Sequence, residues 1–308
     1  MAGHIRGVAA RILHKNPLAL YTHCYSHVLN LVIVKSCSMS QIRNMFGTVQ
    51  KVAESAKRTK YFEDAIHEIH TDSQRRRLKK HCNTRWIEQA DALNVFVALY
   101  NAVIHALDLI KEECDGQSAS SASLMSAAVQ QFGFIVSLSS AEFVLNYTKP
   151  LSVMLQKSGL DICAASNEVR IIQKTLTNVR QVAEERFAKV YGNATKLAAE
   201  AGIEPTMPRI CNRQTHRANP DSGSVSGQST ETYYRTTVFI PFIDNMVQGL
   251  NDRFTKVHQD VAVASQLVPS ILICSARCTD IELDQLKCAY PDVDSNHSLS
   301  AEYDRVAC

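Results

Sequence analysis

The stretch Tyr21-Thr22-His23-Cys24-Tyr25-Ser26-His27-Val28-Leu29-Asn30-Leu31-Val32-Ile33-Val34 brings together two features that decide the fold and the site. Its first half holds two histidines and a cysteine within five residues, and its second half is an apolar run. Such an order predicts a polar site at the edge of a buried element. The natural companion of this stretch is the segment 82–86, Cys-Asn-Thr-Arg-Trp, which contains the single tryptophan of the chain.

The composition is that of a globular protein. At 308 residues, with 45% hydrophobic and 20% charged residues, the chain is long enough to bury a substantial core in one large or two smaller domains. It has no run of about 18 apolar residues and no secretory pattern at its amino terminus, so we expect neither membrane insertion nor export. Ten irregularly spaced cysteines then predict reduced thiols in the nucleus or the cytoplasm.

The charge is divided unevenly along the chain. Residues 1–86 carry a balance of +10, whereas residues 87–308 carry −7, and Glu54 is the first acidic residue. A basic segment of this kind predicts contacts with phosphates, because each neutralised phosphate releases condensed counterions. The alternative is a solvated basic helix face. The candidate nucleic-acid-binding residues are Arg75, Arg76, Arg77, Lys79, Lys80, Arg85 and Trp86.

Apolar spacing at three and four residues predicts a mainly helical chain. We expect helices from Gly7 to Leu13, two across residues 27–52, a basic helix after residues 71–73, and a short buried strand at Leu18–Thr22. A long apolar stripe follows at 92–110, closed by residues 115–123. Further helices are predicted at 124–138, 141–157 with an interruption at Pro150, 167–201, 233–254 and 260–274.

These patterns suggest five regions. They are a first part at 1–86, a helical region at 87–203, a flexible loop at 204–232 rich in Pro, Gly and Ser, a return to helix at 233–290, and a disordered tail at 291–308.

The first motif, the stretch that contains Cys24 and His27, allows two kinds of chemistry. Cys24 and His27 would form half of a zinc site, with His81 and Cys82 as the other half, but adjacent side chains diverge and rarely chelate one ion. A Cys-His nucleophilic pair would lack a local orienting carboxylate. A packed site without chemistry and a site facing nucleic acid are two further interpretations, and we expect no bound metal or cofactor.

Several segments together resemble the hAT superfamily of transposases and their domesticated relatives. Residues 23–32, His-Cys-Tyr-Ser-His-Val-Leu-Asn-Leu-Val, are similar to the HCxxHxLNLV segment of that family, and residues 82–86 are similar to its CxTRW segment. Residues 7–17, 209–217 and 233–244 extend the resemblance. The last two are similar to stretches of the zinc-finger MYM-type and protein-kinase-inhibitor-repressor-like branch of the family.

The resemblance implies an RNase H-like αβ core, interrupted by a large helical insertion domain and holding two metal ions on an Asp, Asp, Glu triad. Cys24, His27, Arg85 and Trp86 match family positions beside that active site, where they help to handle the DNA end. An arginine there would hold a phosphate, and a tryptophan would stack on a base. We therefore expect a remnant of the core in residues 1–86, followed by the insertion domain.

One departure from the family decides the expected activity. The two catalytic Asp residues of the family lie upstream of the segment that corresponds to residues 7–17, and no acid precedes Glu54 in this chain. Glu282 and Glu302 match the third position only by their order. Histidine and cysteine are poor substitutes for oxygen ligands of Mg²⁺. The expected chain is thus an internal fragment without catalytic residues, and not an enzyme.

Three functions remain as hypotheses. The first is a transposase-derived, catalytically inactive protein that associates with DNA in the nucleus. The second is a helical module that binds a regulatory protein partner through the acidic part after Trp86. The third is an active DNA-cleaving transposase, whose metal site another chain or an unnoticed set of acids in this chain would supply.

Overall fold

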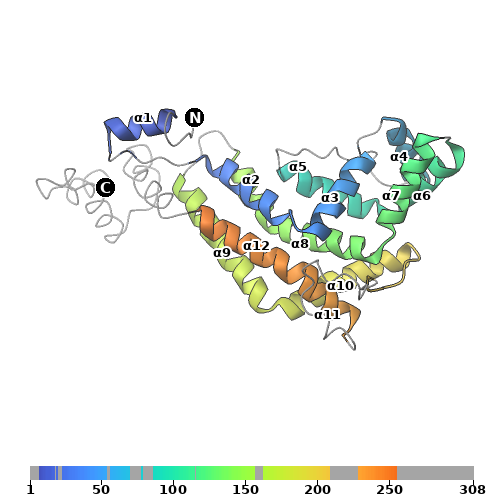
Figure 1. Cartoon of the computed structure of the whole chain (residues 1–308). Coiled ribbons are helices and arrows are strands. Elements are labelled where there is room, and N and C mark those ends of the chain that lie inside the picture. Colours follow the sequence, from blue (N-terminus) through green and yellow to red (C-terminus); the bar gives the residue numbers. More distant parts are fainter. Residues whose placement is uncertain are drawn as a thin grey trace, which may run out of the picture. The chain divides into compact units, whose positions relative to one another are not determined.

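The computed structural model describes residues 7–17, 19, 23–53, 56–69, 78, 86–114, 116–156, 162–208 and 228–254. This part of the chain is mainly helical, and no β-strand occurs among the described residues. Figure 1 shows the order of the helices along the chain. They are α1 (Val8–Lys15), α2 (Tyr25–Ser36), α3 (Ser40–Ala53), α4 (Ala56–Ile69), α5 (Trp86–Ala98), α6 (Tyr100–Glu113), α7 (Gln117–Val129), α8 (Phe132–Met154), α9 (Ile162–Gln181), α10 (Ala183–Glu200), α11 (Thr230–Tyr234), the π-helix η1 (Arg235–Phe239) and α12 (Ile240–Arg253).

The described helices divide between two compact units. One draws on residues 1–29, 153–173 and 250–308, and the larger draws on residues 30–152 and 174–249. Within the described ranges, no single helix is both long and apolar enough to cross a bilayer. On length and composition alone, two bent pairs qualify, namely α5 with α6 and α7 with α8.

Helices α2 and α3 confirm the periodicity seen in the sequence. Their predicted inward residues are all buried, from Leu29, Val32 and Ile33 on α2 to Ile42 and Met45 on α3. The helix predicted at residues 7–13 is also present as α1, and it ends before Asn16-Pro17, because proline cannot continue the hydrogen-bond ladder. None of the residues of α1 is buried.

An aromatic cluster forms the core of the larger unit. Phe239 is fully buried, and its ring centroid lies 5.1 Å from that of Phe187 and 5.7 Å from that of Phe143. Phe132 packs edge-on against Tyr191 at 5.7 Å and against Tyr234 at 5.6 Å. These contacts join α8 and α10 to η1, and the ion pair between Arg235 and Glu184 at 3.0 Å adds to them.

The structure corrects several helix boundaries. The stripe at 92–110 is not straight, because the chain bends by 75° between α5 and α6 at Leu99. The segment 118–123, predicted to close that stripe, is part of α7. The predicted interruption at Pro150 is wrong, since α8 continues through it to Met154 with Leu145 and Leu151 buried on either side. The single helix predicted at 167–201 is two, separated at Val182, whose ψ of 36° is not helical.

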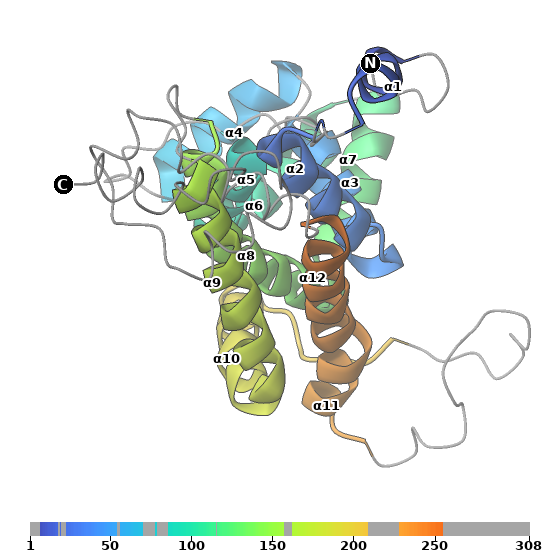
Figure 2. The same ribbon diagram turned by 90° about the vertical axis from the view of Figure 1, so that its left-hand side faces the viewer.

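The helix predicted at 233–254 is confirmed, but it contains an unpredicted π-helical turn. Figure 2 shows α11, η1 and α12 following one another as one rod. The backbone N–H of Ile240 donates to the carbonyl oxygen of Arg235, five residues back. Pro241 comes next and has no N–H. Its ring would collide with the carbonyl four residues back in a regular helix, so a widened turn just before it relieves that contact.

Several predictions lie outside the described residues. They concern the strand at 18–22, of which only Ala19 is described, the basic helix near 73–80, most of the loop at 204–232, the helix at 260–274 and the tail at 291–308. The predicted regions 1–86, 87–203, 204–232, 233–290 and 291–308 stay predictions.

Candidate functional site

The first motif lies at the amino terminus of α2, with its apolar and polar residues on different sides. Tyr25, Val28 and Leu29 are buried, and the ring of Tyr25 lies 5.6 Å from that of Phe254. Cys24 and His27 are exposed. The helical spacing therefore uses the apolar residues for packing and leaves the thiol and the imidazole accessible to solvent.

The backbone at this motif is ordered by the start of the helix. The carbonyl oxygen of Cys24 accepts a hydrogen bond from the N–H of Val28 at 3.0 Å. His23 precedes the helix, and its ring centroid lies 6.2 Å from that of His27. No group of three or more His, Cys, Asp or Glu side chains within the described ranges is arranged to hold a metal ion. His81 and Cys82, the predicted other half of a zinc site, lie outside those ranges.

The second motif is described only at its last residue. Trp86 is the first residue of α5, whereas Arg85 and the basic residues 75–77, 79 and 80 lie outside the described ranges. The nucleic-acid-binding role of these residues therefore stays a prediction, as does the role of Cys24 and His27 beside them.

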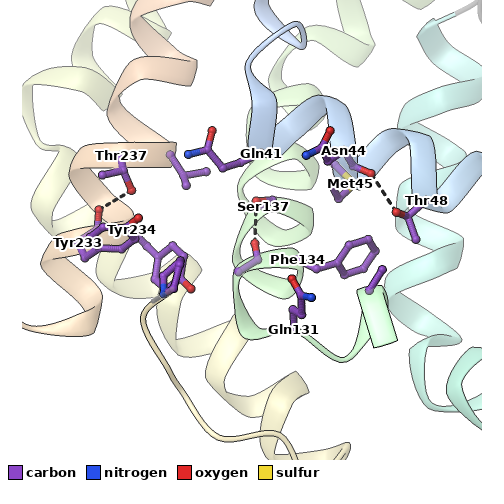
Figure 3. Close-up of a pocket in the computed structure, with 14 residues that line it drawn as sticks. Gln41, Asn44, Met45, Thr48, Gln131, Phe134, Ser137, Tyr233, Tyr234 and Thr237 are labelled. Atoms are coloured by element: carbon purple, nitrogen blue, oxygen red, sulfur yellow. Dashed lines mark hydrogen bonds between the residues drawn. The ribbon is translucent and has the colours of Figure 1, made fainter. Parts of the chain in front are cut away.

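A pocket that the sequence did not reveal lies in the larger unit. It has a volume of about 220 Å³ and is lined by α3, by the α7–α8 turn with the helix ends on either side of it, by Pro208, and by α11 with η1 (Figure 3). Its lining residues are Gln41, Asn44, Met45, Thr48, Ala128, Gln131, Gly133, Phe134, Ser137, Pro208, Tyr233, Tyr234, Thr237 and Val238.

Tyr234 in the aromatic wall of this pocket is anchored by a hydrogen bond and by its neighbours. The hydroxyl of Tyr234 donates to the carbonyl oxygen of Thr206 at 2.9 Å, and burial raises the pKa of this phenol. The Tyr233 ring stands at 82° to it, with 5.1 Å between centroids. Gly133 makes this arrangement possible, because a Cβ there would lie 3.2 Å from the Tyr234 hydroxyl oxygen. Glycine at this position thus leaves room for the tyrosine.

Most hydroxyl groups in the lining bond to their own helix backbone. Ser137 Oγ donates to the carbonyl oxygen of Gly133 at 2.7 Å, and Thr237 Oγ1 donates to that of Tyr233 at 2.8 Å. Thr48 does the same with Asn44 at 3.0 Å. The carboxamides of Asn44 and Gln131, by contrast, make no side-chain hydrogen bond to any residue that the structure describes. They are among the lining groups left available to a ligand.

Taken together, the fold and these two sites define a mainly helical protein with an exposed Cys-His motif and a pocket whose described lining residues carry no charge. The chain is similar to the 52 kDa repressor of the inhibitor of the protein kinase from Homo sapiens, with 28% identity over 275 residues. The Mus musculus protein of the same name is 27% identical over 277 residues.

Each of these matches covers 86% of this chain but only 36% of the relative, so the chain spans about a third of the length of these relatives. No protein-family model matches the chain, and no solved structure matches it. These similarities support a related family for this chain. They agree with the resemblance of the sequence to the protein-kinase-inhibitor-repressor-like branch.

Proposed function

We propose that this chain is a transposase-derived helical protein that associates with DNA in the nucleus through its basic first part and does not cut it. The observation that carries the proposal is the similarity over 86% of the chain to a named repressor, together with the hAT-like segments around Cys24 and Trp86. In this proposal, residues 1–86 derive from an RNase H-like core, and the helices that follow derive from its insertion domain.

The charge distribution supports DNA association. The balance of +10 in residues 1–86 has the sign and local density that neutralise phosphates. In the same part of the chain, Cys24, just before α2, and His27, in its first turn, are exposed to solvent. Thiol and imidazole groups suit hard Mg²⁺ poorly, which supports binding rather than two-metal cleavage as the activity.

The test is salt-dependent binding of the full chain to a labelled DNA duplex, followed by fluorescence anisotropy. We expect log K to fall linearly with log salt, and the slope to shrink by up to about 3 when Arg75, Arg76 and Arg77 are changed to Ala together. A matched control removes three exposed lysines from the acidic part of the chain, and it should leave the slope nearly unchanged. Its substitutions are Lys174→Ala, Lys189→Ala and Lys196→Ala. Equal effects of the two triple variants, or no binding at low salt, would contradict the proposal.

The absence of cleavage is tested separately. Supercoiled plasmid incubated with the full chain and Mg²⁺ or Mn²⁺ should stay uncut. Metal-dependent nicking that disappears in Glu282→Gln or Glu302→Gln would show an active enzyme instead.

A second candidate is a helical module that binds a regulatory protein. The names of the relatives favour it, because they describe action on an inhibitor of a protein kinase. The balance of −7 in residues 87–308 has the opposite sign to that of the first part. We expect a protein partner to crosslink to this acidic part in nuclease-treated extracts, and the Arg75–Arg77 triple variant to crosslink equally well. Loss of all crosslinks after nuclease treatment would favour DNA association alone.

A further inference from the structure

The pocket between α3, the α7–α8 turn and η1 has the chemistry of a small-molecule site. Among the lining residues that the structure describes, none is Lys, Arg, Asp, Glu or His. Its walls are aromatic and apolar, with Phe134, Tyr234 and Met45 buried. Three carboxamides, those of Gln41, Asn44 and Gln131, belong to exposed residues and therefore lie where the pocket meets solvent. This combination favours an uncharged ligand with an apolar face and a polar edge.

Carboxamides give such a ligand a defined edge. A carboxamide offers a donor and an acceptor side by side in one plane, and this pair matches the hydrogen-bonding edge of a nucleobase. Asn44 and Gln131 have these groups uncommitted to any described residue, whereas Gln41 already accepts from Ser40 Oγ at 2.9 Å. Figure 3 shows that Asn44 comes from α3 and Gln131 from the α7–α8 turn, so two separate elements contribute these carboxamides.

The size of the pocket limits the ligand to one or two fused rings. A dry cavity of about 150 Å³ holds benzene, and drug-sized ligands take about 300 Å³ or more. The volume of about 220 Å³ lies between these limits. A nucleobase fits that interval, and the half-buried ring of Tyr233 offers a surface for contact with its face.

The π-helical turn supplies one wall of this site. Thr237 and Val238 of η1 line the pocket beside Tyr233 and Tyr234 of α11. One extra residue in a turn rotates the following side chains by about 100° relative to a regular α-helix. Such turns are frequent at functional sites. The widened turn therefore decides which side chains of this rod line the pocket and which enter the aromatic core.

We propose that this pocket binds a single uncharged nucleobase. The base contacts the aromatic wall, its edge pairs with the carboxamides of Asn44 and Gln131, and a sugar attached to it points to solvent. Because no cation is among the described residues that line the pocket, a phosphate attached to that sugar adds little to the affinity. The same base chemistry is available from a free nucleoside and from an unpaired base in a single strand, and the experiment distinguishes these two sources.

The experiment is isothermal titration calorimetry of the full chain with adenosine, guanosine, cytidine and uridine. We expect one-site binding of at least one nucleoside with Kd below about 1 mM, and the monophosphate of that nucleoside should bind within about threefold of it. A single-stranded homo-oligonucleotide of the same base forms the second arm. Binding of the oligonucleotide that competes with the nucleoside identifies a strand as a source, whereas nucleoside binding without competition restricts the site to free ligands.

Two variants test the recognition, and one serves as a matched control. Asn44→Leu and Gln131→Met keep the side-chain size and remove the hydrogen bonds, and each should weaken binding about tenfold. Gln181→Met changes an exposed carboxamide outside the pocket and should leave the Kd unchanged. The thermal midpoint of each unliganded variant confirms that it is folded.

Three results would overturn the proposal. They are no heat of binding with any of the nucleosides up to about 1 mM, an unchanged Kd in both pocket variants, and equal binding of indole, which has no amide edge, by all variants. The Arg75–Arg77 triple variant should bind the nucleoside normally, because the proposed recognition uses the carboxamides of Asn44 and Gln131. Failure of DNA association and failure of this inference are therefore distinguishable.

Discussion

The close contact between α2 and α12 gives a sharp prediction about how the motif-bearing helix is held. A Cβ added at Gly249 would lie 3.0 Å from Cγ1 of Val32 and 3.8 Å from its Cα. Val32 is fully buried, and a β-branched side chain in a helix is nearly fixed at χ1, so it has little room to move away. Gly249→Ala should therefore introduce a steric conflict at this crossing.

The magnitude follows from two opposing terms. Replacing glycine by alanine inside a helix stabilises it by about 0.5–1 kcal/mol. Overpacking a buried contact costs about 1–3 kcal/mol. We expect Gly249→Ala to destabilise the protein by about 1 kcal/mol, which corresponds to a fall of about 2 °C in Tm. Gly192→Ala is the matched control, because a Cβ there meets no atom within 4 Å, and it should be stabilising.

The assay is thermal and urea unfolding of five proteins, namely the parent, Gly192→Ala, Gly249→Ala, Val32→Ala and the Gly249→Ala/Val32→Ala double variant. Truncating Val32 removes the atom that the new Cβ meets, so Gly249→Ala should become neutral or stabilising in the Val32→Ala background. If Gly249→Ala stabilises the parent as much as Gly192→Ala does, Val32 does not hold α2 tightly against α12, and the reasoning is refuted.

Three further predictions concern buried side chains. Phe239→Ala should destabilise the larger unit by about 3–5 kcal/mol, measured by urea unfolding, because the Phe239 side chain is fully buried among aromatic rings. In thiol labelling followed by peptide mapping, Cys24 should react rapidly and Cys37 only on unfolding, because Cys24 is exposed while burial raises the pKa of the Cys37 thiol. Burial also raises the pKa of Tyr100, whose hydroxyl donates to the Val129 carbonyl at 2.5 Å. The contribution of this hydroxyl to the free energy of unfolding is therefore complete below about pH 10 and is lost as the pH rises above it. Tyr100→Phe should cost about 1–2 kcal/mol at pH 7, and the urea midpoint should then fall less between about pH 9 and about pH 11 than in the parent.

The interruptions between helices show where sequence patterns fail to predict the end of a helix. The bend at Leu99 and the break at Val182 carry no glycine or proline, and Val182 is 44% exposed. Pro150, the residue expected to break a helix, lies inside α8. A local signal predicts a cost of about 3 kcal/mol for proline in a helix interior. The burial of Leu145 and Leu151 on either side of Pro150 outweighs that cost, and burial is a property of the whole unit.

The two candidate sites also differ in whether the sequence predicts them. The motif at Cys24 and His27 was visible because its residues are neighbours in sequence and stand before an apolar run. The pocket was not visible, because it joins residues 41–48, 128–137, 208 and 233–238, and its recognition groups are ordinary exposed carboxamides. A Gln or Asn on a helix surface has no sequence signal that separates a ligand-binding role from simple solvation.

The sequence by itself determined that this protein is mainly helical, which faces of α2 and α3 are buried, and that a Cys-His motif stands at the start of α2. Those properties are local, since the periodicity of apolar residues dictates which side of a helix leaves water. Only the tertiary structure decided where the long helical segments bend, that a π-helical turn precedes Pro241, and that segments far apart in the sequence enclose a pocket. These features depend on the packing of side chains that are far apart in sequence, because the free energy of burial is shared by all the elements that meet in the core.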